Sequence, residues 1–157
     1  MLRNDILENL KKRFGSQILE MEDKSPKRVY VQIDPVALRT IATYLFKELG
    51  ARFNIASGMD EREHMEILYH FTLEDMNLII SLRVKLDKKN LKIDSLTTLF
   101  EAANWVEREI HELLGIDFIG HPDLRRLLLP ENWPDGVYPL RRDYKEWDPT
   151  AVRTRGA

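Results

Sequence analysis

The stretch HMEILYHFTLEDMNLIISLRVKL, residues 64–86, decides the fold class. Apolar residues occupy every second position in two runs, with Met65, Ile67, Tyr69, Phe71 and Leu73 in the first and Leu78, Ile80, Leu82, Val84 and Leu86 in the second. Alternation with a period of two is typical of a strand that buries one face. The four residues 74–77 between the runs include two acids and an asparagine, which suits a turn. The stretch therefore predicts a β-hairpin with one face on the core.

Upstream of the hairpin, the spacing of apolar residues predicts a short amphipathic helix over 2–14, a strand over 28–33, a helix over 34–49 and a strand over 51–57. Asp34 and Pro35 suit an N-cap followed by proline at the first helical position. In this second helix we expect a buried side made of Val36, Ile41, Leu45 and Leu49.

Downstream of the hairpin, residues 85–94 are polar and predict a loop or a frayed strand end. Ser95 is expected to cap a helix that ends at Gly115. Its apolar stripe comprises Leu99, Ala103, Val106, Ile110 and Leu113.

The pattern disappears after Gly115, where four of the seven prolines fall between residues 122 and 139. A segment broken so often is neither a regular helix nor a central strand. It is nevertheless rich in leucine and aromatic residues, so it either wraps over its own domain or lies on another protein. We predict an α+β fold with a small, mainly antiparallel sheet packed against helices, as a domain over 1–115. An extended proline-rich C-terminal segment over 116–157 would then dock on a partner.

Composition limits the function further. The chain has 157 residues and a formal net charge of −2, which gives no overall attraction to nucleic acid or anionic lipid. It has no cysteine, so thiolate-held iron–sulfur clusters and a cysteine-ligated nickel are excluded within the chain. No apolar run approaches the roughly 20 residues that span a bilayer, so we expect membrane contact only through partners. No glycine-rich phosphate loop is present.

The histidines do not indicate a metal site. His64 and His70 suit ordinary hairpin positions, and His111-Glu112 begins a zinc-protease motif whose second histidine is replaced by Gly115. We therefore expect no metal, no cofactor and no catalytic residue in this chain.

The segment from Trp105 to Tyr144 carries the most specific signal. It reads WVEREIHELLGIDFIGHPDLRRLLLPENWPDGVYPLRRDY and resembles the signature region of the complex I thirty-kilodalton subunit family, whose members are also known as the C-type subunits. Two blocks match with fixed spacing, the second of them Pro139-Leu-Arg-Arg-Asp-Tyr144. The first block is matched by Glu107, Arg108, Glu109, Glu112, Leu113, Leu114, His121, Arg125, Leu127 and Leu128.

The charged residues of these blocks suggest how the segment is held. Glu107, Arg108 and Glu109 are consecutive on a helix, so at least one flanks the apolar stripe and needs a partner. We expect bidentate arginine–carboxylate pairs to fix the path of the proline-rich segment. The arginines that are available for such pairs are Arg125, Arg126, Arg141 and Arg142. His121 is expected to mark the turn into the segment, and Trp133, Asp143 and Tyr144 complete the residues assigned to the partner interface.

The resemblance implies a non-catalytic scaffold subunit that docks on a hydrogenase-like large subunit, of the D type in complex I, and on a small cluster-bearing subunit, of the B type. A ferredoxin-like cluster subunit is a further partner that it suggests. Iron–sulfur clusters, and a NiFe centre where there is one, would then belong to the partners. The complex would lie on the cytoplasmic side of the cell membrane, with this chain peripheral.

The sequence His-Glu-Leu-Leu at residues 111–114 resembles the form found in membrane-bound energy-converting NiFe hydrogenases and related ferredoxin-linked complexes. We therefore favour such a complex as the one to which this chain belongs. The C-type subunit of NADH:quinone oxidoreductase (complex I) remains an alternative, and a stand-alone adaptor domain is a second one. A metalloenzyme and a nucleic-acid-binding protein are less favoured, because ligands are missing and acids are interleaved with the arginines of the segment.

Overall fold

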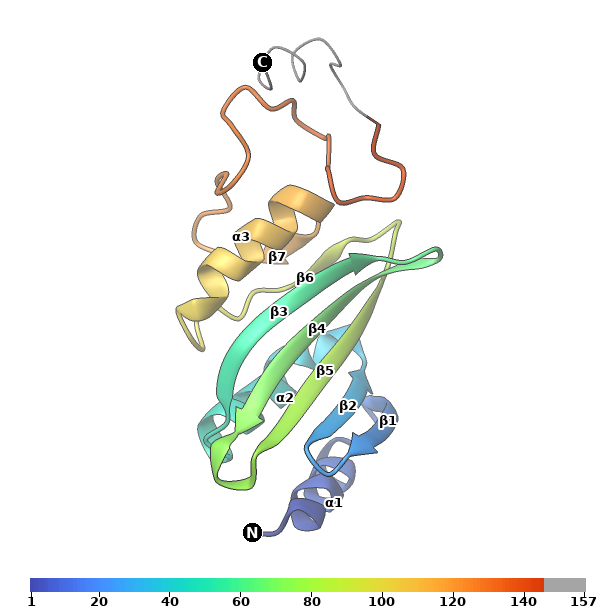
Figure 1. Ribbon diagram of the computed structural model, residues 1–157, viewed down its shortest axis with the longest axis vertical. Helices are drawn as coiled ribbons and strands as arrows, with labels where there is room; N and C mark the ends of the chain where they lie inside the picture. Colours follow the sequence, from blue (N-terminus) through green and yellow to red (C-terminus); the bar gives the residue numbers. More distant parts are fainter. Residues whose placement is uncertain (146–157) are drawn as a thin grey trace.

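A five-stranded mixed sheet forms the centre of the molecule in the computed structural model, which describes residues 1–145 (Figure 1). Its strands lie in the order β1-β2-β5-β4-β3. The pair β2–β5 is parallel, and the pairs β1–β2, β5–β4 and β4–β3 are antiparallel. The bounds of the strands are Ile18–Ser25 for β1, Arg28–Ile33 for β2, Arg52–Asp60 for β3, His64–Leu73 for β4 and Leu78–Asp87 for β5.

The predicted hairpin is confirmed. β4 and β5 pair antiparallel from Met65 opposite Leu86 to Leu73 opposite Leu78. A short 3₁₀ turn, η3 (Glu74–Met76), joins them and ends at Asn77, which has a left-handed φ of 49°. All ten alternating apolar residues of the two runs are buried.

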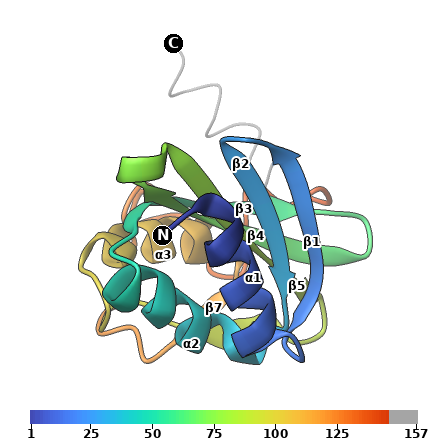
Figure 2. The same cartoon turned by 90° about the horizontal axis from the view of Figure 1, so that it is seen from below.

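The three α-helices found within residues 1–145 lie on one side of the sheet and bury that face (Figure 2). The first helix, α1 (Arg3–Phe14), confirms the prediction. The predicted helix over 34–49 is helical but divided into a 3₁₀ turn η1 (Pro35–Ala37), α2 (Leu38–Thr43) and a π-helical turn η2 (Tyr44–Glu48). Asp34 caps it as expected, with its Oδ1 accepting the Val36 amide at 3.0 Å. The assignment of Val36 to the buried side was wrong, because that side chain is 77% exposed.

Residues 85–94, predicted as a loop or a frayed strand end, contain the end of one strand and a second short strand. β5 continues to Asp87, and the unpredicted strand β6 (Lys92–Asp94) pairs in parallel with β7 (Asp117–Ile119). Phe118 of β7 is 2% exposed and belongs to the core. The edge strand β1 was not predicted, and β3 extends three residues beyond the predicted end at 57.

The last helix, α3 (Ala102–Leu114), begins seven residues after Ser95 and packs against β3. Gly58 of β3 makes the close contact, because a Cβ at this position would lie 2.6 Å from Cδ1 of Leu114 and 3.2 Å from Cγ2 of Ile110. Ala103, Ile110 and Leu114 are buried, whereas Val106 and Leu113 of the predicted stripe are only partly buried. The helix ends at Gly115 with a φ of 80°, as predicted.

Residues 120–145 form no helix or strand. They leave the body near the end of β7 and run past the C-terminal half of α3 (Figure 1). We call these residues the C-terminal segment. The remaining part of the predicted docking tail, 146–157 with Trp147, lies outside the described residues.

Candidate functional site

Three charged side chains of α3 are buried, which makes this helix unusual. Glu107 is 1% exposed, Arg108 9% and Glu112 7%. A buried charge destabilises the fold unless hydrogen bonds or an opposite charge compensate it. The hydrogen-bond partners of these three side chains therefore show which parts of the chain the helix binds.

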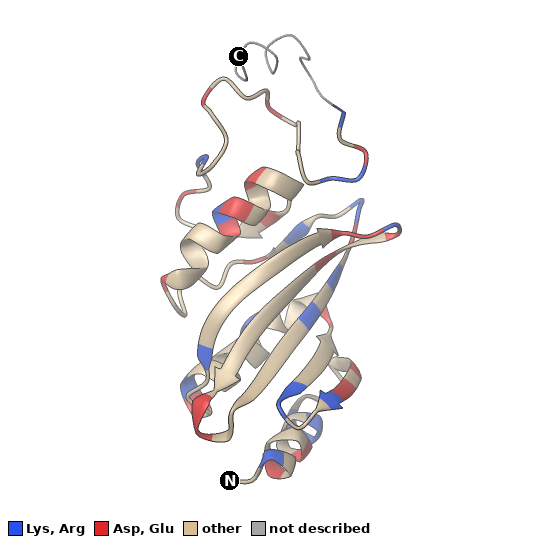
Figure 3. Cartoon of the chain, viewed as in Figure 1, with Lys and Arg blue, Asp and Glu red and all other residues tan. Residues whose placement is uncertain are grey.

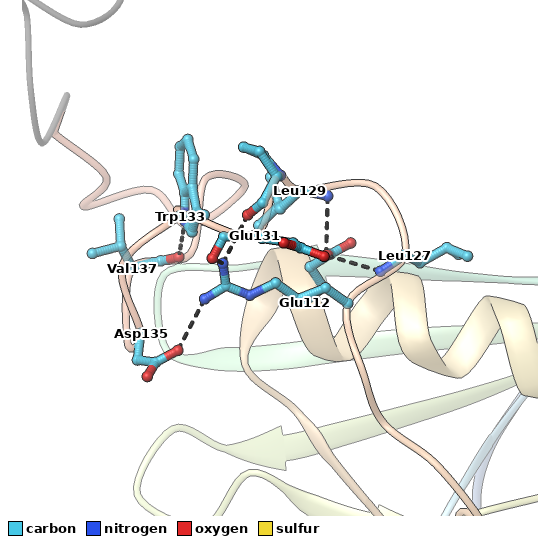
Figure 4. Close-up of polar contacts among 9 residues, drawn as sticks. Glu112, Leu127, Leu129, Glu131, Trp133, Asp135 and Val137 are labelled. Carbon is cyan, nitrogen blue, oxygen red and sulfur yellow. Dashed lines mark hydrogen bonds and ion pairs between the residues drawn. The ribbon is translucent and has the colours of Figure 1, made fainter.

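The carboxylate of Glu112 accepts three backbone amides of the C-terminal segment. Its Oε1 accepts from Leu127 and from Leu129, both at 3.0 Å, and its Oε2 accepts from Leu128 at 2.8 Å. Figure 4 shows the side chain reaching from α3 towards the segment. Hydrogen bonds to a charged acceptor are about twice as strong as neutral ones, so this contact fixes the turn at 127–129.

Arg108 makes the complementary contact one turn earlier on the helix. Its Nε donates to the carbonyl of Arg125 at 3.0 Å, and its Nη2 donates to the carbonyl of Arg126 at 2.7 Å. Arg108 thus binds carbonyls where Glu112 binds amides. Together the two side chains satisfy backbone groups of a segment that has no secondary structure of its own.

The prediction of arginine–carboxylate pairs between the segment and Glu107, Arg108 or Glu109 was wrong, because no such pair forms within residues 1–145. Arg125 pairs with Asp123 of the segment itself, at 3.1 Å. Arg126 donates to Asp135 at 2.9 Å and to the carbonyl of Pro130 at 2.8 Å, closing a loop. Glu109 is exposed and has no hydrogen bond through its side chain or ion pair within the described residues.

Glu107 faces the opposite side and fastens the connection before the helix. Its Oε1 accepts from the Leu96 amide and its Oε2 from the Ser95 hydroxyl, both at 2.6 Å. Burial raises the pKa of Glu107 to about 7, although the two hydrogen bonds favour the ionised form. The negative charge of Glu107 also adds to the effect of burial in raising the pKa of Tyr69, whose buried hydroxyl has no hydrogen-bond partner among residues 1–145.

The raised pKa of Glu107 predicts a pH-dependent stability. The pKa of this carboxyl is about 7 in the folded chain, against an ordinary value of 4.5. The folded state therefore binds the proton more tightly than the unfolded state, and the stability that this gives is lost as the pH rises from 4.5 to 7. Between pH 5 and 7 we expect the free energy of unfolding to fall by about 2 kcal/mol more in the native chain than in Glu107→Gln. Urea unfolding of both proteins at several pH values measures this, and parallel pH profiles would contradict it.

The segment returns to cap the C-terminal end of α3. The Leu140 amide donates to the Leu113 carbonyl at 3.1 Å, and Nε of Arg141 donates to the Leu114 carbonyl at 2.7 Å. The guanidinium of Arg141 also lies 4.2 Å from the ring centroid of Tyr138. A cation at this end compensates the last carbonyls of the helix and its dipole.

His121 lies at the turn into the segment, as the sequence predicted. Its Nε2 lies 3.0 Å from the Asn104 carbonyl, and its Nδ1 lies 3.0 Å from the Asp123 amide. A carbonyl requires a donor and an amide requires an acceptor, so the neutral tautomer with a proton on Nε2 fits both contacts. The ring thereby links α3 to the segment.

The other predicted interface residues lie at the far end of the segment. Trp133 donates from Nε1 to the Val137 carbonyl at 2.8 Å, and its ring stacks on Tyr144 with centroids 6.2 Å apart. The Arg142 amide donates to Asp60 of β3 at 2.9 Å, which links the segment to the sheet. Asp143 is exposed.

The segment is held in place but not buried. None of the residues 120–145 is buried, and the apolar side chains of Leu128 and Leu140 are 62% and 58% exposed. Exposed apolar side chains on an ordered loop are a feature that protein interfaces share. The sequence did not indicate Ser95, Leu96, Asn104 or Asp60 as partners, because they contribute through backbone atoms or single hydroxyl and carboxyl groups without a motif.

Two features are absent from the described part of the chain. No group of three or more histidine, cysteine, aspartate or glutamate residues is placed to hold a metal ion there. No helix within residues 1–145 has the length and apolar character needed to cross a membrane.

Comparison with known proteins gives one family and several relatives. The family model described as "Respiratory-chain NADH dehydrogenase, 30 Kd subunit" matches residues 31–149. The C subunit of the F(420)H(2) dehydrogenase of Methanosarcina mazei is 34% identical over 143 residues, which cover 89% of this chain and 90% of that protein. The C/D subunit of the NADH-quinone oxidoreductase of Serratia proteamaculans is 31% identical over 94% of this chain and 27% of its own length. Hydrogenase-4 component G of Escherichia coli is 31% identical over 90% of this chain and 26% of its own length.

This chain thus spans about a quarter of the length of the latter two relatives. Among solved structures, it superposes on the trypsin-resistant fragment of Nqo5 with a TM-score of 0.64 and 21% identity, over 76% of this chain and 97% of the other. A chain of the membrane-bound sulfane sulfur reductase, an archaeal respiratory membrane complex, gives a TM-score of 0.72 and 16% identity, over 98% and 89% of the two chains. At these identities the structural likeness shows the fold alone.

Proposed function

We propose a function from the premise that this chain belongs to the family of the 30 Kd subunit of respiratory-chain NADH dehydrogenase. It is a C-type component of complex I-like or hydrogenase-related membrane complexes. Within such a complex we assign it a non-catalytic role as a scaffold and assembly subunit. It would dock on the hydrogenase-like large subunit and on the small cluster-bearing subunit.

One observation supports this proposal above all. The C-terminal segment is fixed by buried charges of α3, yet its own leucines stay exposed. Ordering a loop before it binds lowers the conformational entropy lost on association. Leu128 and Leu140 are suited to enter apolar pockets of the large subunit, and the other exposed residues of the predicted tail over 116–157 would extend the contact. The core of the molecule, which includes β7, would position this segment for docking.

The redox chemistry would belong to the partners. The chain has no cysteine, and cysteine thiolates hold the iron–sulfur clusters that such complexes need. The clusters, a NiFe centre where the complex is a hydrogenase, and a ferredoxin-like cluster subunit are therefore assigned to other chains. Contact with the cytoplasmic side of the cell membrane would come through those chains.

For the identity of the complex, we favour a membrane-bound NiFe hydrogenase or a related ferredoxin-linked ion-pumping complex. The His-Glu-Leu-Leu sequence at 111–114 supports this choice, as does the similarity to hydrogenase-4 component G. The NADH:quinone oxidoreductase is the second candidate, favoured by the similarity to several C/D subunits of that enzyme. The C subunit of the F(420)H(2) dehydrogenase of Methanosarcina mazei matches over 90% of its length, so a dehydrogenase of that kind is a further candidate.

Affinity purification from a native membrane extract tests the proposal. A tagged full-length chain should bring down a large and a small subunit with iron and acid-labile sulfide, and stoichiometric nickel would identify a hydrogenase. A chain ending at Gly120 lacks only exposed or partly buried residues within the described range, so it should keep its circular dichroism and bring down neither subunit. Retention of both subunits by the shortened chain would contradict docking through the segment. Absence of any redox subunit with the full-length chain would favour a free adaptor.

A further inference from the structure

The outer face of α3 carries an exposed tryptophan between two acids. Glu101, Trp105 and Glu109 follow at steps of four residues and therefore share one side of the helix. The indole is 69% exposed, and both glutamates are exposed. Neither carboxylate forms a hydrogen bond through its side chain or an ion pair within residues 1–145. The other faces of the helix are occupied by β3 and by the C-terminal segment.

A cavity of about 730 Å³ lies beside this indole. It is lined by Thr97, Thr98, Glu101, Asn104, Gly120 and Pro122. α3 carries more acidic than basic residues, with a single arginine and no lysine (Figure 3). This Arg108 is turned towards the segment and Glu101 and Glu109 are exposed, so the exposed charges on this side of the helix are acidic. The same face continues through Leu113 to the exposed Leu140, whose amide binds the Leu113 carbonyl.

An aromatic face next to carboxylates is a receptor for a guanidinium group. The face of an indole attracts cations more strongly than any other side-chain ring, and a carboxylate accepts the planar guanidinium through paired hydrogen bonds. The two acids lie about 12 Å apart along the axis, with the indole between them. An arginine that lies flat on Trp105 can therefore reach Glu109, while a second base in the same strand of chain reaches Glu101.

We propose that Glu101, Trp105 and Glu109 bind an arginine-containing basic segment of a neighbouring subunit. The acidic, aromatic face selects a basic partner by charge, and its continuity with Leu140 places that partner beside the docking segment. This inference rests on the proposed function, since it requires a neighbouring subunit. It adds a second contact whose chemistry differs from that of the leucines, because it is electrostatic and salt-sensitive.

Site-specific photo-crosslinking in the assembled complex tests the contact. A benzophenone amino acid is placed at position 105, at Leu128 of the docking segment, and at Leu19 of β1 as an exposed control that is 61% accessible. The probe at 105 should label a peptide of another subunit that contains arginine with a further arginine or lysine nearby. Labelling only of lipid, or of a peptide without a basic residue, would overturn the inference. If the probe at 128 labels another subunit and the probe at 105 does not, only this inference is contradicted. If neither probe labels another subunit, the proposed function is contradicted as well.

Charge-neutral variants give a second readout. Rebinding of purified chain to complex stripped of it should be about tenfold weaker at low salt for Glu101→Gln/Glu109→Gln, and the difference should vanish at high salt. Trp105→Leu should weaken binding at both salt concentrations. The double variant Glu8→Gln/Glu20→Gln, which removes two exposed acids from α1 and β1, should bind like the native chain. Equal salt dependence in the two double variants would contradict an ionic contact on α3.

Discussion

Replacing Glu112 with alanine is expected to release residues 127–129 from α3 and to weaken assembly of the complex about hundredfold. Three backbone amides lose their shared charged acceptor in this variant. Each hydrogen bond to a charged group contributes about 1.5–3 kcal/mol, and water compensates part of that loss once the turn opens. A net loss of about 3 kcal/mol corresponds to roughly a hundredfold change in the equilibrium. The leucines would then have to be ordered during binding.

Amide hydrogen exchange in the isolated chain measures the release directly. The amides of Leu127, Leu128 and Leu129 should exchange about a hundredfold faster in Glu112→Ala, while the amides of β4 keep their protection. Glu109→Ala is the matched control in the isolated chain, because it removes an exposed glutamate from the same helix without disturbing the turn at 127–129. Unchanged exchange at the three leucines would show that the carboxylate does not hold the turn.

The local alternation of apolar residues predicted the two central strands of the sheet, but it could not predict which strands pair over long distances in the sequence. The hairpin of β4 and β5 was predictable because its alternation is strict and its two strands are adjacent in sequence. The parallel contact of β2 with β5 joins Arg28 to Ile79 and leaves no local trace. Strand β1 was missed because it is an edge strand with two register irregularities and mostly exposed side chains, so its apolar residues do not alternate.

At the candidate site, the sequence indicated the important residues but not the groups that they bind. The sequence drew attention to the charged residues of α3 and to the proline-rich segment, but we expected their side chains to pair with one another. In the structure Arg108 and Glu112 bind backbone carbonyls and amides instead. A segment without helix or sheet leaves its backbone groups unpaired, and buried charges on a neighbouring helix are the strongest partners available to them. Backbone groups are the same at every residue, so no side-chain pattern could reveal this contact.

Gly115 illustrates how one residue serves both the helix and the segment. Its φ of 80° ends α3, which the sequence predicted. The structure adds that a Cβ at this position would lie 2.7 Å from the ring of Tyr138 and would also meet Nη2 of Arg141. These are the side chains that bring the segment back to the end of α3. A glycine is thus required here for its conformation and for its lack of a side chain.

Gly115→Ala is therefore expected to destabilise the chain by about 3 kcal/mol, through left-handed strain of about 1–2 kcal/mol and displacement of Tyr138 and Arg141 for the remainder. Gly120→Ala separates the two causes. Gly120 has a φ of 84°, but a Cβ there would meet nothing within 4 Å, so only the strain should appear. Urea unfolding compares the two variants, and exchange of the Leu140 amide reports the return of the segment. Equal losses in both variants, with Leu140 still protected, would mean that the segment does not depend on Gly115. A larger loss with an exposed Leu140 amide would show that the end of the helix and the path of the docking segment are one structural unit.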